Sequence, residues 1–163
     1  MTASHLWTLL VVVGLAACSA EPSRSNAQPE TPEPASPAVS AESPAASDLR
    51  LTVDGREIGA RLADNPTARD LANLLPLQLS FRDLNGVEKI ARLPRPLTTD
   101  GVPDGSDPTV ADIGYYAPAN DLVLYYGDVG YFDGIVNVGR FDAGALEWIR
   151  GQPDGVAVAI DRA

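Results

Sequence analysis

The chain of 163 residues is long enough for one ordinary domain with additional segments, and a hydrophobic fraction of 45% excludes disorder over its whole length. Its 22 acidic and 12 basic side chains give a net charge of -10, which repels phosphate backbones, so we expect no nucleic-acid partner. The single cysteine and the single histidine, His5 near the N-terminus, exclude an intramolecular disulfide, a thiolate-rich or histidine-ligated metal site and a Ser-His-Asp triad in the folded part. We therefore expect no metal and no cofactor.

Residues 1–17 are typical of a signal peptide. The apolar run from Leu6 to Ala17 is shorter than the roughly 20 residues that cross a bilayer, and it suits a signal-peptide core. It ends in Leu15-Ala16-Ala17-Cys18, which resembles the bacterial lipobox. The resemblance implies a secreted lipoprotein of the cell envelope, anchored in a membrane by lipid on Cys18. Ser19 resembles outer-membrane sorting signals of cells with two membranes. The alternative is a buried core helix with an incidental free cysteine.

The segment that follows Cys18, up to residue 47, is predicted to be a disordered tether. Between Ser19 and Ser47, 20 of 29 residues are Pro, Ser or Ala and none is aromatic. Such a segment cannot bury enough apolar area to offset its ordering entropy, and its prolines favour an extended spacer. The composition changes at Asp48, so we place the folded domain at residues 48–163.

The domain begins with patterns of a β-hairpin and a helix. Apolar and polar residues alternate from Leu49 to Val53, Asp54-Gly55 favours a type I′ turn, and the apolar face continues from Ile58 to Leu62. A two-residue loop would pair Val53 with Arg56. Asn65 is then a predicted N-cap for a helix that begins at Pro66 and ends at Pro76.

The remaining elements are mostly short strands separated by turns. Strands are predicted from Leu77 to Phe81, from Val87 to Leu93 after an Asn85-Gly86 turn, from Ile113 to Ala117, from Leu122 to Tyr126, from Ile135 to Phe141 and over Val156 to Ile160, with a loop at 93–112 and a helix over Ala143 to Arg150. Short strands joined by tight turns predict a mainly β fold, a closed or nearly closed barrel with helical lids.

Three motifs in order resemble a known family. The stretches FRDLNGVEKIARLP and ADIGYYAPANDLVLYYGDVGYFDGIVNVGRF are similar to the bacterial family of cyclophilin-like domain proteins, and the resemblance covers nearly all of residues 48–163. It implies a closed eight-stranded barrel with two capping helices. The function we favour is a peptide or small-ligand binding module without efficient isomerase activity. One alternative is a divergent peptidyl-prolyl cis-trans isomerase that acts on envelope proteins. A second alternative is a purely structural role within a lipoprotein assembly.

The positions that the resemblance assigns to isomerase chemistry hold other residues. Counted from the turn glycine, the cyclophilin arginine falls on Ala91, and Arg92 one residue later would point to the opposite face of a strand unless a bulge intervened. The family's tryptophan and histidine positions match Tyr131 and Val136. Arg92 is therefore the only catalytic candidate, for the alternative function.

All five tyrosines lie within 17 residues: Tyr115, Tyr116, Tyr125, Tyr126 and Tyr131. Because neighbouring side chains in a strand point to opposite faces, one ring of each Tyr-Tyr pair should face inward and the other outward. We interpret the outward rings as an aromatic groove on the outer face of the barrel; ordinary core and surface aromatics are the alternative.

Four aspartates in the loop and Arg140 are also considered as possible binding residues. The spacing of Asp100, Asp104, Asp107 and Asp112 does not match a calcium loop, and a solvated acidic loop is expected instead. Arg140 is expected to form a structural ion pair with Asp128 or Asp142.

Overall fold

The computed structural model describes residues 48–163; the predicted signal peptide, Cys18 and the tether lie outside the described residues. The elements run in the order β1 (Asp48–Val53), β2 (Arg56–Leu62), α1 (Pro66–Ala72), β3 (Leu77–Leu84), β4 (Glu88–Arg92), β5 (Gly105–Ser106), β6 (Asp112–Tyr116), β7 (Asp121–Tyr125), β8 (Phe132–Asp133), β9 (Ile135–Phe141), α2 (Leu146–Arg150) and β10 (Val156–Arg162). Short 3-10 turns at Ala117–Ala119 and Ala143–Ala145 complete them.

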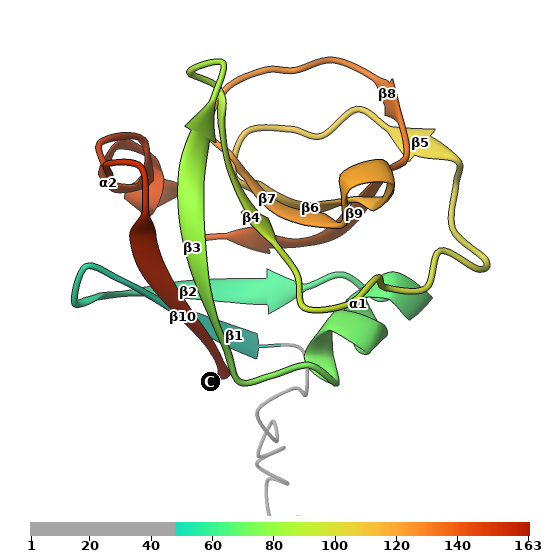
Figure 1. Cartoon of the computed structure of the whole chain (residues 1–163), viewed down its shortest axis with the longest axis horizontal. Coiled ribbons are helices and arrows are strands. Elements are labelled where there is room, and N and C mark those ends of the chain that lie inside the picture. Colours follow the sequence, from blue (N-terminus) through green and yellow to red (C-terminus); the bar gives the residue numbers. More distant parts are fainter. Residues whose placement is uncertain (1–47) are drawn as a thin grey trace, which may run out of the picture. The chain divides into compact units, whose positions relative to one another are not determined.

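Eight of the strands close into an antiparallel barrel, which confirms the predicted fold class (Figure 1). The order around the barrel is β1-β10-β3-β4-β7-β6-β9-β2, and every neighbouring pair is antiparallel. A closed sheet has no open edge among these strands, so each can satisfy its backbone on both sides. The short strands β5 and β8 pair separately outside the barrel.

Both predicted hairpins form, and the first has the predicted register. Val53 pairs with Arg56 and Leu51 with Ile58 across a turn in which Asp54 and Gly55 both have positive φ angles of 47° and 77°. Positive φ at both central residues is what a type I′ turn requires, and Asp and Gly tolerate it best. Asn85 and Gly86 between β3 and β4 also have positive φ angles, of 56° and 69°, but Leu84 pairs with Glu88, so this loop includes Val87 and β4 begins one residue later than predicted.

Helix α1 begins as predicted and ends earlier. The Asn65 side chain accepts a hydrogen bond from the backbone N–H of Ala68 at 2.8 Å, and Pro66 occupies the first turn. The helix stops at Ala72 instead of continuing to Pro76, since the backbone N–H of Leu74 bonds to Leu71 in a tighter turn. The second predicted helix is divided into a 3-10 turn, whose Gly144 N–H is capped by Asp142, and α2.

The barrel interior holds one continuous apolar core. It includes Phe81, Leu124 and Tyr115 from the strands, and Leu71 of α1 and Ile149 of α2 extend it. Within residues 48–163 every buried side-chain nitrogen or oxygen has a hydrogen-bond partner, so the interior is both filled and satisfied. In the same part of the chain, neither helix has the length and apolar composition of a membrane span.

Two details differ from expectation. The loop at 93–112 contains β5, which pairs with β8. This pairing could not be predicted from hydrophobic periodicity, because each strand has only two residues. Arg140 binds Asp112 at 2.8 Å, and neither Asp128 nor Asp142. The expectation of those two partners was wrong because strand pairing sets Arg140 of β9 opposite Asp112 of β6.

Candidate ligand-binding groove

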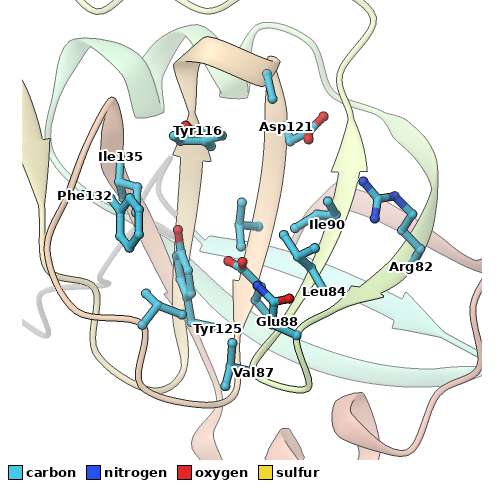
Figure 2. Close-up of a pocket in the computed structure, with 14 residues that line it drawn as sticks. Arg82, Leu84, Val87, Glu88, Ile90, Tyr116, Asp121, Tyr125, Phe132 and Ile135 are labelled. Atoms are coloured by element: carbon cyan, nitrogen blue, oxygen red, sulfur yellow. The ribbon is translucent and has the colours of Figure 1, made fainter.

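The outer face of the barrel carries a groove of about 580 Å³ between the β3–β4 hairpin and the pairing of β5 with β8 (Figure 2). That volume is within the range of small-molecule binding sites. Its walls are largely apolar, and the residues that line it are Arg82, Leu84, Asn85, Val87, Glu88, Ile90, Tyr116, Ala119, Asp121, Val123, Tyr125, Val129, Phe132 and Ile135.

A second apolar cluster, separate from the barrel core, forms the floor of the groove. It consists of Ile90, Val123, Tyr125 and Ile135, with Leu84, Tyr116 and Val129 packed against it. Strand β7 shows why two apolar clusters form. Its Leu122 and Leu124 belong to the interior core, whereas its Val123 and Tyr125 belong to the outer cluster. Because side chains alternate along a strand, an apolar run in β7 places apolar surface on both faces of the sheet.

The ring of Tyr125 lies against the backbone of Gly114 on the neighbouring strand β6. A Cβ atom at position 114 would lie 2.6 Å from Cε2 of Tyr125, closer than real carbon contacts allow. Glycine at this position therefore lets the ring rest on the sheet, and the ring forms part of the groove (Figure 2).

The strands β5 and β8 bring an aromatic side chain to the edge of the groove. Phe132 of β8 lines the groove, although 56% of it remains exposed. Gly105 of β5 permits the close pairing, since a Cβ there would lie 2.5 Å from the Phe132 carbonyl oxygen. The hydrogen bond from the Gly134 N–H to the Asp104 carbonyl, 2.6 Å long, holds the same two segments together.

Glu88 is a half-buried carboxylate within the groove. It pairs with Tyr125 across β4 and β7, and Figure 2 shows its side chain directed between Tyr125 and Leu84. Burial raises the pKa of Glu88, and the nearby negative charge of Asp83 raises it further. Within residues 48–163 its carboxylate forms neither a hydrogen bond nor an ion pair. Burial, followed by the charges of Glu88 and Asp112, also raises the pKa of Tyr125.

The five tyrosines divide between the two faces of the sheet. Tyr116 and Tyr125 line the groove. Tyr115 and Tyr126 lie inside the barrel, where their hydroxyls bond to Asn120 and Asp83, so they contribute to the core and not to the groove. Tyr131 is 61% exposed beside Phe132 but does not line the groove.

The arginine that reaches the groove is Arg82 of β3. Arg92 does point outward, while Ala91 faces the core, but Arg92 forms an ion pair with Asp121 at 3.0 Å and borders a neighbouring hollow. Arg82 borders both cavities, and no ion pair holds it among the described residues. Val136, at the family's histidine position, faces the barrel core.

Sequence reasoning missed Glu88, Arg82 and Phe132 as groove residues. The sequence holds a signal for the floor of the groove in β7, where Leu122 to Tyr125 are apolar at consecutive positions instead of alternating with polar residues. In the described part of the chain, no group of three possible metal ligands occurs in the acidic loop or elsewhere. Asp112 of this loop is engaged by Arg140 and by Thr109.

Comparison with known proteins supports the architecture. Residues 51–161 match the model of the cyclophilin-like family. Among solved structures, the chain resembles the hypothetical protein AF2241 from Archaeoglobus fulgidus, with a TM-score of 0.56 at 19% identity over 76% of this chain and 99% of that one. It also resembles McbB, solved in complex with tryptophan, with a TM-score of 0.50 at 14% identity over 70% of this chain and 44% of that one. At such identities both structures indicate the fold alone. No curated protein matches the chain.

Proposed function

The chain belongs to the cyclophilin-like family, and we propose that its barrel is a binding module that holds a small ligand or peptide segment in the outer-face groove. The observation that supports this proposal is the second apolar cluster. Its buried residues form the floor of a groove whose walls remain partly exposed, and a concave, largely apolar surface with a few polar groups is the usual form of a ligand site.

The same proposal places the module at the cell envelope. The lipobox-like segment ending at Cys18 and the Pro-rich tether suit a domain held outside a membrane by lipid, in an outer membrane where two membranes exist. We expect Cys18→Ala to move the protein from the membrane fraction to the soluble fraction. Unchanged membrane retention of this variant would contradict the lipid anchor.

Ligand binding can be tested on the mature chain from residue 18, with Cys18→Ser so that it carries no lipid. Amide chemical shifts in nuclear magnetic resonance spectra report which strands a small apolar probe contacts. We expect 4-phenylbutanol to shift the amides of β4 and β7, and Phe132→Ala to weaken its binding. Val110→Ala, which changes a partly exposed apolar residue that does not line the groove, is the control. Shifts scattered over the surface, or none, would contradict the proposal.

One observation favours a second candidate, the divergent prolyl isomerase. Arg82 lines the groove without an ion-pair partner among residues 48–163, and a guanidinium beside a proline nitrogen would stabilise the twisted amide. If this function applies, a protease-coupled proline-peptide assay should give a rate above background that Arg82→Gln abolishes. Arg92→Ala should leave that rate unchanged because Arg92 does not line the groove. A background rate for the unsubstituted chain would exclude the isomerase.

A further inference from the structure

A carboxylate without a partner is an unusual component of an apolar groove. Glu88 stands between the Tyr125 ring and Leu84, and within residues 48–163 no donor contacts it. Two other carboxylates with limited exposure are paired: Asp70 binds Arg95 at 2.6 Å, and Asp121 binds Arg92 at 3.0 Å. A partly desolvated charge gains most from a cationic partner that forms hydrogen bonds with it.

Acidic side chains outnumber basic ones around the groove. Asp128 and Asp133 adjoin the lining residues Val129 and Phe132, and neither forms an ion pair in the described structure. Residues 48–163 as a whole carry 18 acidic and 11 basic side chains, a net of -7. The exposed Arg82 is the one cationic residue among those that line the groove, and it lies at the edge formed by β3. A negative field over the site attracts cations and repels anions.

From this arrangement we propose that the groove selects small apolar compounds that carry an ammonium group. The ammonium binds the Glu88 carboxylate, and the apolar body lies against the accessible side chains of Leu84, Tyr116 and Phe132, above the buried floor of the groove. This inference rests on the proposed binding function and names the ligand chemistry of the same site.

A small compound fits the groove better than an extended partner. The groove has a defined volume of about 580 Å³, closed at one side by Phe132 and floored by the outer cluster. Sites of this size enclose most of a drug-sized ligand. A lysine side chain of a peptide carries the same ammonium chemistry, and a peptide arm in the experiment distinguishes it.

The experiment compares three probes that share one apolar body: 4-phenylbutylamine, 4-phenylbutanol and 4-phenylbutanoate. Binding to the mature Cys18→Ser chain is followed by amide chemical shifts at pH 7. We expect the amine to bind about tenfold more tightly than the carboxylate, with the alcohol between them, since a charge-assisted contact is stronger than a neutral one. A capped Phe-Lys-Phe peptide should bind more weakly than the amine.

Variants identify the group responsible. Glu88→Gln keeps the shape of the side chain and should reduce the amine to the affinity of the alcohol. Glu57→Gln makes the same chemical change on the exposed strand β2, away from the groove, and should leave the preference intact. If Glu88→Gln fails to fold, Arg82→Gln serves instead and should weaken the carboxylate while the amine remains bound.

The outcomes separate this inference from the binding function. An amine preference that depends on Glu88 supports both. Probes that shift groove amides without an amine preference, or with one that survives Glu88→Gln, overturn the inference and leave the binding function standing. Tighter binding of the peptide than of the amine overturns the assignment to small compounds. If no probe shifts the groove amides, the binding function and the inference both fail.

Discussion

Strands β4 and β7 carry apolar side chains on both faces, and the two sets of side chains have different roles. Toward the interior, Leu122, Leu124 and Ala91 join a core in which every buried polar side chain of the described residues is paired. Toward the outside, Val123 and Tyr125 join an apolar cluster that borders a groove of about 580 Å³. Burial alone therefore does not identify core residues. A buried residue on the inner face is needed for stability, whereas one on the outer face also shapes a cavity.

The largest difference is expected when one phenylalanine in the barrel interior and one at the groove are each replaced by alanine. Phe81 is 0% exposed in the interior, so Phe81→Ala should lower the free energy of unfolding by about 3–5 kcal/mol. Phe132 is 56% exposed at the groove, so Phe132→Ala should change it by less than about 0.5 kcal/mol while weakening ligand binding. Urea unfolding of both variants measures the difference. Equal losses of stability would show that Phe132 at the groove contributes to the folded state as much as an interior residue does.

A smaller effect is expected where the groove floor meets the backbone. Gly114→Ala places a methyl group against the Tyr125 ring, which must move away from the sheet. We expect a loss of about 1–3 kcal/mol in unfolding free energy, as for other overpacked sites. Gly59→Ala on β2 is the matched control, since nothing lies within 4 Å of its added carbon. Gly114→Ala should also shift the amides of the groove floor in the unliganded protein; unchanged shifts would mean that the ring does not rest on Gly114.

The smallest expected effect concerns an interior hydroxyl. Tyr126 donates to the Asp83 carboxylate, and Tyr126→Phe should cost about 1 kcal/mol of unfolding free energy at neutral pH. Burial and this hydrogen bond raise the pKa of Tyr126 to about 12 from an ordinary value of 10.0. The folded state therefore holds its proton more tightly than the unfolded state, and the stabilisation is complete below pH 10 and is lost as the pH rises toward 12.

Thermal unfolding at several alkaline pH values checks this prediction. The difference in stability between the unsubstituted protein and Tyr126→Phe should shrink between pH 10 and 12. Tyr116→Phe on the groove face is the comparison, because the Tyr116 hydroxyl bonds to no group among residues 48–163 and its removal should cost less. A constant difference across this pH range would contradict the role given to the Tyr126 hydroxyl.

Much of the fold could be predicted because its signals are local. The Asp54-Gly55 and Asn85-Gly86 turns need positive φ at two successive residues, and Asn65-Pro66 supplies both a cap and a preset first turn. The alternation of side chains in a strand likewise predicted that each Tyr-Tyr pair would divide between the faces. The strands β5 and β8 could not be predicted, because a strand of only two residues shows no hydrophobic periodicity.

The candidate site was only partly predictable because its members come from separate strands. Sequence reasoning placed an aromatic groove on the outer face and named Tyr116 and Tyr125, but it also named Tyr115 and Tyr126, which lie in the core. Sequence reasoning also considered Arg92. Arg92 forms an ion pair with Asp121, because these two residues pair across β4 and β7. Nothing local distinguishes Arg92 from Arg82, which is the arginine that borders the groove.

By itself the sequence determined the turns, the period of the strands and the family pattern, because hydrogen bonding and steric preferences of neighbouring residues specify them. Only closure of the barrel decided which outward side chains meet. It set β3 and β4 beside β7 and β6, left Glu88 facing Tyr125 without a partner in the described residues, and paired Arg140 with Asp112. Such neighbours are fixed by register between strands distant in the chain, so they follow from the tertiary structure and not from any single segment.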